Sequence, residues 1–231
     1  MTFLPALRRG VIAALAATVI ALSACSNSDP AREPDPANPN TDSAEASLAH
    51  AMTTFRSAQL MTVTLVDNDS GKTTITRDLA NDAIEVSRRL RGGTFLTLRR
   101  IGPDYYLRTN ADSWDSEKFP GLSTQFSPSM GKGWYAMRPD ADGFDVVLEV
   151  HDAGAEISGL LPKGALEATG STKVIDGVKT SEFASPTWKV YISDEAQQLV
   201  EAINLEGTTR YLYDFDPQPL SKPKNVRHDL S

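Results

Sequence analysis

Short runs of alternating apolar and polar residues make up much of this chain from residue 60 onward. In residues 60–67 (LMTVTLVD), Met61, Val63 and Leu65 alternate with two threonines, which is the period of a half-buried strand. Similar runs separated by turn residues predict strands at 73–79, 83–90, 95–100 and 105–109. Consecutive strands joined by such short turns predict an antiparallel meander.

A second group of strands is predicted after an irregular middle segment. Residues 115–130 are rich in Ser, Pro and Gly and are expected to form a long loop before a short strand at 133–137. Further strands are predicted at 165–174, 178–185, 187–193, 198–206 and 208–215. Three prolines, at 217, 219 and 223, predict that the tail ends as an edge strand or coil.

Two segments have helical periodicity instead. Residues 44–57 place Leu48, Ala51, Met52 and Phe55 on one side, and Thr41 or Ser43 is expected to cap this helix. Residues 142–152 show the same spacing at Phe144, Val147, Leu148 and His151. Both predicted helices are amphipathic, so each is expected to lie on another part of the protein.

These elements predict an α+β fold. A long antiparallel sheet of about ten strands tends to curl, and its concave apolar face needs a cover. The predicted architecture is therefore a curled antiparallel sheet that forms an incomplete, half-open β-barrel, with the two helices covering its concave side.

The first 24 residues differ from the rest and predict a secretory signal. Two arginines precede an apolar run at 11–22, which is too short to span a hydrocarbon core of ~30 Å as a helix. The run ends in Leu22-Ser23-Ala24-Cys25, which matches the bacterial lipobox, and Cys25 is the only cysteine. We therefore predict a diacylglycerol anchor on Cys25 that holds the protein at the outer face of the cell membrane. The alternative is a soluble exported protein with an incidental cysteine.

Residues 25–43 predict a disordered tether between this anchor and a single domain at 44–231. The tether has four prolines between residues 26 and 43 and no aromatic residue, so it has too little apolar surface to offset its chain entropy. No second apolar stretch approaches 18 residues, so the lipid is expected to be the only membrane attachment.

Charge and chemistry narrow the function classes. The formal charge of the chain is −7, and it becomes −9 after removal of residues 1–24, which argues against a nucleic-acid partner. His50, His151 and His228 have no metal-ligand spacing, and no serine lies in a G-x-S-x-G motif. Residues 67–71 resemble a calcium loop but have Arg77 where the loop needs Glu. We therefore expect no catalytic site, metal or cofactor.

The apolar rows of the strands are the candidate ligand-binding surface. They are expected to face the concave side of the sheet, where they either line a cavity for a lipid or other amphiphile or meet the helices in a dry core. These residues are Met61, Val63, Leu65, Ile75, Ile84, Val86, Leu96, Leu98, Trp188, Val190 and Ile192. The many threonines and charged residues of the sheet favour a small or shallow cavity.

A cluster of arginines marks one hairpin. Arg88, Arg89 and Arg91 precede its turn, and Arg99 and Arg100 follow it. Guanidinium groups suit phosphates and carboxylates, so Arg88, Arg89 and Arg91 are candidates for contact with lipid headgroups or an acidic envelope protein. The alternative is a solvated hairpin with surface ion pairs, and strand alternation predicts that these side chains do not all face one way.

Three segments in the C-terminal half carry a family resemblance: "VIDGVKTSEF", "TWKVYISDEAQQLVEAIN" and "YLYDFDPQP". With the lipobox and tether ahead of them, they resemble LppX/LprG-type actinobacterial lipoproteins and, more distantly, the carriers LolA and LolB, over roughly residues 45–225. The resemblance implies a half-open barrel whose cavity takes acyl chains, and a role in carrying or presenting lipids or glycolipids. The alternative function is a protein-interaction lipoprotein, a sensor or accessory subunit, with a filled cavity.

Overall fold

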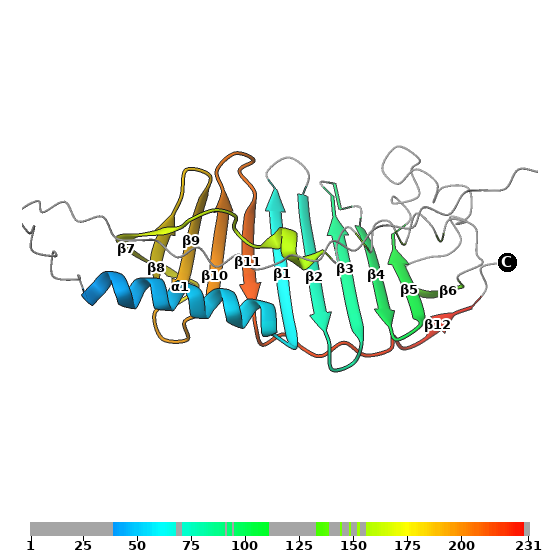
Figure 1. The fold of residues 1–231 in the computed structure, drawn as a ribbon. Helices are drawn as coiled ribbons and strands as arrows, with labels where there is room; N and C mark the ends of the chain where they lie inside the picture. Colours follow the sequence, from blue (N-terminus) through cyan, green and yellow to red (C-terminus); the bar gives the residue numbers. More distant parts are fainter. Residues whose placement is uncertain are drawn as a thin grey trace, which may run out of the picture. The chain divides into compact units, whose positions relative to one another are not determined.

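Twelve strands join into one open sheet in the part of the chain that the computed structural model describes (Figure 1). The described residues are 39–67, 71–90, 92–93, 95–110, 133–138, 144, 148, 152 and 156–228. Residues 37–231 form one compact unit, to which the following description applies.

Every predicted strand is present, and its ends lie within two residues of the predicted ones. The first meander consists of β1 (Leu60–Asp67), β2 (Gly71–Asp78), β3 (Ala83–Arg89), β4 (Phe95–Ile101) and β5 (Asp104–Thr109). The later strands are β6 (Trp134–Met137), β7 (Glu167–Ile175), β8 (Val178–Ala184), β9 (Trp188–Ser193), β10 (Leu199–Asn204) and β11 (Arg210–Asp214). The tail adds a short edge strand, β12 (Val226–Arg227).

The first helix is longer than predicted. It spans Pro39–Ser57 (α1), so the prediction that residues 39–43 belong to the tether and that Thr41 or Ser43 caps the helix is wrong. A proline is well suited to the first helical position, because its fixed φ is helical and the N–H it lacks would have no partner there.

The second predicted helix and the predicted long loop lie mostly outside the described residues. Of residues 142–152, Phe144, Leu148 and Asp152 are described, and each is helical. A short 3-10 helix that the sequence pattern did not predict, η3 (Ile157–Leu160), precedes β7. No described helix is long and apolar enough to cross a membrane.

The strand order is β12-β6-β5-β4-β3-β2-β1-β11-β10-β9-β8-β7. Two meanders, β1–β5 and β7–β11, therefore meet in the middle, where β1 pairs with β11 (Figure 1). The described pairings are antiparallel except that of β12 with β6. The sheet is curled and ends in two edges, so the prediction of a mostly antiparallel sheet that does not close is confirmed.

Apolar side chains on the face of the sheet that α1 touches, here called the inner face, form two clusters. α1 packs against β7, β9 and β10. The α1 cluster contains Ala51, Phe55, Met61, Val63, Ile75, Ile84, Val86, Leu160, Leu161, Phe183, Trp188, Val190, Ile192, Leu199, Ala202 and Tyr213. The β5 cluster contains Leu96, Leu98, Leu107, Tyr135, Met137 and Phe144.

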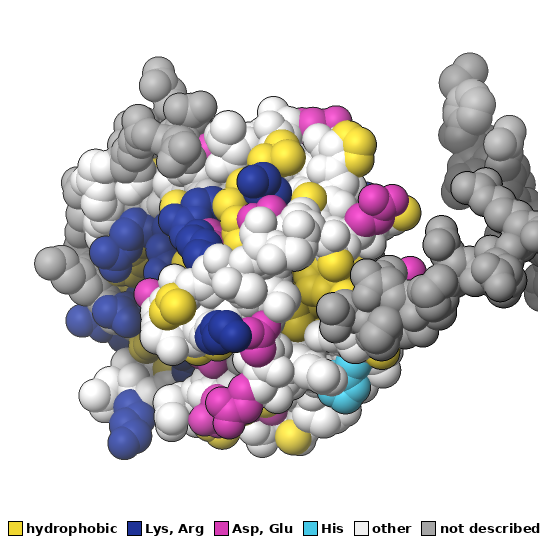
Figure 2. Space-filling model, turned by 90° about the vertical axis from the view of Figure 1, so that its left-hand side faces the viewer, with side chains coloured by type: hydrophobic (Ala, Val, Ile, Leu, Met, Phe, Trp, Pro, Cys, Tyr) yellow, Lys and Arg dark blue, Asp and Glu magenta, His cyan; other side chains and the backbone are white. Residues whose placement is uncertain are grey.

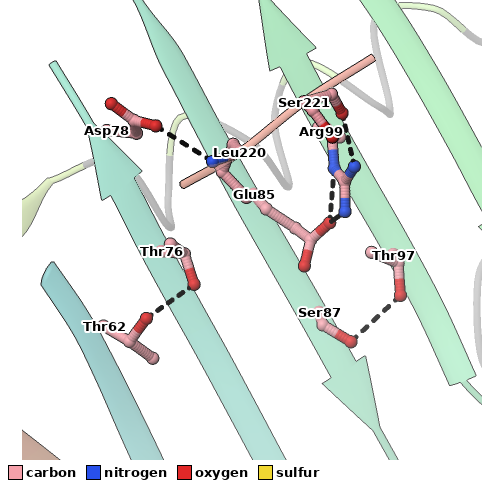
Figure 3. A network of polar contacts seen from close by, with 9 residues as sticks. All are labelled: Thr62, Thr76, Asp78, Glu85, Ser87, Thr97, Arg99, Leu220 and Ser221. Atoms are coloured by element: carbon pink, nitrogen blue, oxygen red, sulfur yellow. Dashed lines mark hydrogen bonds and ion pairs between the residues drawn. The ribbon is translucent and has the colours of Figure 1, made fainter. Parts of the chain in front are cut away.

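The C-terminal segment 216–225, here called the strap, is bonded to β2, β4 and β5, and Figure 3 shows its bonds to β2 and β4. The Leu220 N–H donates to Asp78 Oδ2 at 2.9 Å, and Arg99 Nη1 donates to the Ser221 carbonyl at 2.6 Å. Lys222 Nζ donates to Asp104 Oδ2 at 2.7 Å. The strap thereby leads the chain from β11 to β12 at the far edge of the sheet.

Candidate functional site

The predicted ligand-binding rows share the inner face of the sheet. Met61, Val63, Ile75, Ile84, Val86, Trp188, Val190 and Ile192 belong to the α1 cluster, with Leu65 packed at its margin, and Leu96 and Leu98 belong to the β5 cluster. Cross-strand register aligns them: Val63 is opposite Ile75, Ile75 opposite Val86, and Val86 opposite Leu98. The alternating pattern therefore predicted correctly which side chains share a face.

The inner face has a seam between β3 and β4. Val86 and Leu98 are register partners on neighbouring strands, yet among the described residues they belong to different apolar clusters. A domain usually has one main core with smaller satellite clusters, and here the division between the two falls on neighbouring strands of one sheet face.

α1 is fixed to the inner face near the middle of the sheet. The Phe55 ring meets the Tyr213 ring edge to face, with centroids 5.6 Å apart. The Tyr213 hydroxyl donates to the Leu160 carbonyl at 2.8 Å, and burial raises the pKa of Tyr213 far above its usual value. These contacts hold together α1, β11 and the segment ahead of β7, so this part of the inner face is built as a core.

Arg77 is an inner-face residue that the sequence analysis did not select as a candidate. It is the register partner of Met61, and its Nη2 donates to the Ala58 carbonyl at 2.9 Å, just beyond the end of α1. Its Nε is buried and has no hydrogen-bond partner among the described residues, and burial lowers the pKa of the group. The signal was available, because the period of two that places Ile75 on the inner face places Arg77 there as well.

The outer face of β7–β11 has its own polar cluster, centred on Glu201. This carboxylate is fully buried and accepts from Lys173 Nζ at 3.2 Å and from Arg210 Nε at 2.6 Å. Nearby, the Tyr191 hydroxyl donates to Glu182 at 2.9 Å; burial and this bond raise the pKa of Tyr191 to about 12. Figure 2, which faces the β7 end, shows Lys and Arg side chains gathered on its left side.

The outer face of β1–β4 is lined by hydroxyl pairs. Thr62 and Thr76 lie 2.8 Å apart, and Ser87 and Thr97 lie 3.0 Å apart (Figure 3). Beside them Arg99 Nε donates to Glu85 at 2.7 Å. Such cross-strand pairs satisfy polar groups within the sheet, so these residues stabilise the strands.

The arginines of the β3–β4 hairpin do not form one patch. Arg88 and Arg89 are exposed and adjacent in β3, so they point to opposite faces of the sheet. Arg99 is bonded to Glu85, and Arg100 Nη2 is 3.0 Å from Asp82 Oδ1. Arg91 lies outside the described residues, so contact of Arg88, Arg89 and Arg91 with headgroups or a partner stays a prediction.

Most of the remaining candidate residues are either exposed or lie outside the described part of the chain. His50 is exposed on α1 and His228 is exposed in the tail. Cys25, His151 and part of the calcium-like segment at 67–71 lie outside the described residues. Within the described ranges, no group of three or more His, Cys, Asp or Glu side chains is arranged to hold a metal ion.

The chain matches known proteins in structure but not in sequence. No family model matches the chain, and no curated protein matches it in sequence. The lipoprotein LppX of Mycobacterium tuberculosis is similar in structure, with 12% identity over 78% of this chain and 98% of that chain and a TM-score of 0.46. The chain resembles LppX in fold.

A second solved structure is similar over almost the same length. It is an uncharacterized conserved protein from Thermus thermophilus, with 9% identity over 80% of this chain and 99% of that chain and a TM-score of 0.35. At such low identities the two matches concern the course of the chain, and neither assigns a ligand to it.

Proposed function

We propose that this protein is an exported lipoprotein, anchored through Cys25, that binds a lipid or other amphiphile against the inner face of its open sheet. The ligand lies along the seam between β3 and β4 and is lined by Ile84, Val86, Leu96 and Leu98. Met61, Val63, Leu65, Ile75, Trp188, Val190 and Ile192 extend the same apolar face toward α1.

The seam is the observation that carries this proposal. An apolar ligand gains free energy in proportion to the apolar surface it removes from water, so it needs a long apolar face that its own protein does not fuse into one core. The inner face has such rows on β1 to β4 and on β9, and among the described residues its two clusters divide at register partners Val86 and Leu98. The sheet does not close into a barrel, so no pairing between its two edges constrains the strands on either side of the seam.

One observation favours a second function, that of a protein-interaction lipoprotein with a filled interior. The inner-face side chains Val63 and Val190 are 1% and 0% exposed, and Leu98 is 2% exposed. Side chains buried this completely behave as core. In this alternative the sheet is a rigid scaffold, and an envelope protein binds its exterior.

Native mass spectrometry tests the ligand directly. The full chain with Cys25→Ser is suitable, because any lipid found on it cannot be a covalent anchor. We expect a population whose mass exceeds that of the protein, and an amphiphile in the organic extract. Protein that has only its own mass, and that also fails to bind an added apolar dye, contradicts the proposal and favours the filled interior.

A matched pair of substitutions locates the ligand. Val86→Phe adds bulk at the seam, and Val63→Phe makes the same change inside the α1 cluster. Overpacking a filled core costs about 1–3 kcal/mol, so we expect that loss for Val63→Phe in urea unfolding. Val86→Phe is expected to cost less and to reduce the amount of co-purified amphiphile. Equal loss of stability with unchanged amphiphile content places the ligand elsewhere or removes it.

The anchor has an independent test. Cys25→Ser is expected to release the protein from the membrane fraction of its native cells or to stall its processing, because the thioether cannot form. If this variant is found in the same cell fraction as the wild type and has the same mature chain length, Cys25 is not lipidated. The ligand proposal would then still stand, since it rests on the inner face alone.

A further inference from the structure

One end of the outer face of β2–β5 carries three basic side chains that have no ion-pair partner among the described residues. Lys72 in β2 is the register partner of Arg89 in β3, and both are exposed. Arg108 in β5 is exposed as well. Among the described residues, no carboxylate lies within ion-pair distance of any of the three.

The direct pairing of Lys72 with Arg89 is unfavourable for the sheet. Like charges at directly opposite positions on neighbouring strands destabilise the pair. The backbones of β2 and β3 approach closely here, because a Cβ at Gly71 would collide with the Arg89 carbonyl oxygen, so glycine is required next to Lys72. A local arrangement that opposes stability is characteristic of a functional surface.

Two aromatic rings complete the patch. Phe95 is the register partner of Arg89, and Trp134 is the register partner of Arg108. The Arg108 guanidinium lies 5.6 Å from the Phe95 ring centroid and 6.0 Å from that of Trp134. Both aromatic residues are half-buried. The patch formed by Lys72, Arg89, Arg108, Phe95 and Trp134 therefore combines positive charge with amphipathic rings on one face.

The basic residues at the other end of the sheet provide a contrast. Arg210 and Lys173 share the buried carboxylate of Glu201, and Lys189 lies 3.9 Å from Glu182. Arg99, next to Trp134, is paired with Glu85. Each of those cations lies near a carboxylate, whereas the three cations of the β2–β5 patch have no carboxylate within ion-pair distance among the described residues, although the whole chain carries −7.

We infer that this patch is a membrane-contact surface for a bilayer that bears anionic phospholipid headgroups. Basic side chains are attracted to an anionic surface, and tryptophan favours the headgroup region, where its ring is apolar and its N–H remains solvated. The charge complementarity orients the protein, because the remaining acidic surface is repelled by the same bilayer. The contact uses the outer face, so it is independent of a ligand on the inner face.

Vesicle co-sedimentation tests the inference with the full chain carrying Cys25→Ser. Vesicles of phosphatidylcholine alone measure binding through the apolar N-terminal segment, and vesicles that also contain phosphatidylglycerol measure the added electrostatic binding. We expect stronger binding to the second kind, reduced by high salt. The double variant Lys72→Gln/Arg89→Gln is expected to bind these anionic vesicles about 10- to 30-fold more weakly, with binding to neutral vesicles unchanged.

The matched control is Arg56→Gln/Lys163→Gln, which removes one Arg and one Lys that are exposed outside the patch. This control is expected to bind anionic vesicles like the parent chain. Equal loss in both double variants would mean that net charge alone matters, and no preference for anionic vesicles would exclude a membrane role. If the patch serves an acidic protein instead, vesicle binding stays unchanged, and this result also overturns the inference.

Discussion

The α1 cluster and the β5 cluster occupy the same face of one sheet but are built differently. The α1 cluster has sixteen buried residues in the described part of the chain, and its helix supplies Ala51 and Phe55 to it. The β5 cluster has six, and of these Phe144 comes from outside the strands. On the opposite side of the sheet, β2, β4 and β5 are bonded to the strap through Asp78, Arg99 and Asp104.

The difference shows two ways to stabilise a long open sheet. One half buries apolar surface between strands and a helix, which is the larger contribution to folding free energy. The other half has a smaller cluster, and on its outer face β4 and β5 form charge-assisted hydrogen bonds with the strap, which also bonds β2 of the first half. The two halves are divided on the inner face at the seam, but the strap joins them on the outer face, because it is bonded to β2 on one side of the seam and to β4 and β5 on the other.

The largest expected effect is in the α1 cluster. Phe55→Ala removes a side chain that is 1% exposed and packs on Tyr213, so we expect a loss of about 3–5 kcal/mol in urea unfolding. His50→Ala, at an exposed position of the same helix, is the control and is expected to change stability by less than about 0.5 kcal/mol.

Hydrogen exchange of Phe55→Ala sharpens the comparison. Amides of β9 and β10 are expected to lose protection, because α1 packs on those strands. Amides of β4 and β5 are expected to retain theirs, since separate clusters open separately. Equal loss of protection across the sheet would show that the two clusters unfold as one unit.

The next effect concerns the outer face of β7–β11. Glu201→Gln keeps the shape of a buried carboxylate but removes its charge, which Lys173 and Arg210 both bond. Hydrogen bonds to charged groups contribute about 1.5–3 kcal/mol, so we expect a loss of about 2 kcal/mol. Glu195→Gln, at an exposed position, controls for the change in net charge. Identical melting curves for the two variants would show that the bonds of Lys173 and Arg210 to the buried Glu201 carboxylate add nothing.

At the strap we expect a smaller effect on stability, and this effect depends on pH. Burial raises the pKa of Asp78, but hydrogen bonds from the Asn81 side chain and from the N–H groups of Leu220, Asn81 and Ala80 outweigh it and hold the pKa below the usual 3.8. A carboxyl group whose pKa is lower in the folded state stabilises the protein at pH values above its unfolded-state pKa. This stabilisation is lost as the pH falls through the folded-state pKa. Asp78→Asn is therefore expected to cost about 1 kcal/mol at neutral pH and less below pH ~4.

The control for the strap is Asp82→Asn. Asp82 bonds Arg100 from a side chain that is 70% exposed, so this variant is expected to lose little stability at any pH. A difference between wild type and Asp78→Asn that stays constant from neutral to acid pH would mean that the charge of Asp78 does not hold the strap.

The smallest effect is a titration. The pKa of Tyr191 is raised to about 12 by burial and by its bond to Glu182, so its contribution to stability is complete below the unfolded value of ~10 and is lost as pH rises through about 12. The difference in phenolate absorbance between wild type and Tyr191→Phe is expected to show one group titrating near about 12. A group titrating near ~10 would mean that Tyr191 is solvated.

Sequence alone predicted the strands of both meanders, because alternation is a local signal. For β1, the alternating pattern predicted both ends of the strand and its inward side chains, Met61, Val63 and Leu65, and the structure agrees on both points. The first helix was predicted at 44–57, and its start was misplaced because the composition of residues 39–43 is also that of a tether. Local patterns therefore predict whether a segment is a helix or a strand better than they predict the residue at which it begins.

Alternation failed at Glu201, for a physical reason. Counting by two from the buried Leu199 would place Glu201 on the inner face. A register shift between Leu199 and Glu201 turns the carboxylate to the outer face and brings Ala202 into the α1 cluster instead. Such bulges depend on the neighbouring strands, so a pattern within one strand does not reveal them.

The remaining features join residues that are far apart in the chain. Neither the strap, in which Leu220 reaches Asp78, nor the division of the inner face at Val86 and Leu98 has a local signature. The patch at Lys72, Arg89 and Arg108 becomes visible only when the register of four strands is known. Sequence predicted its arginine in β3 but grouped it with neighbours that face the other way.

The pairing of β1 with β11 sets an order of events for folding. Hairpins within β1–β5 and within β7–β11 close over short loops, but the middle of the sheet joins residues 62–66 to residues 210–214. Closing so long a loop is slow, and until it happens β1 presents a bare edge able to pair with another chain. The nascent protein therefore passes through a stage in which almost the whole polypeptide must be available before its central strand is protected from aggregation.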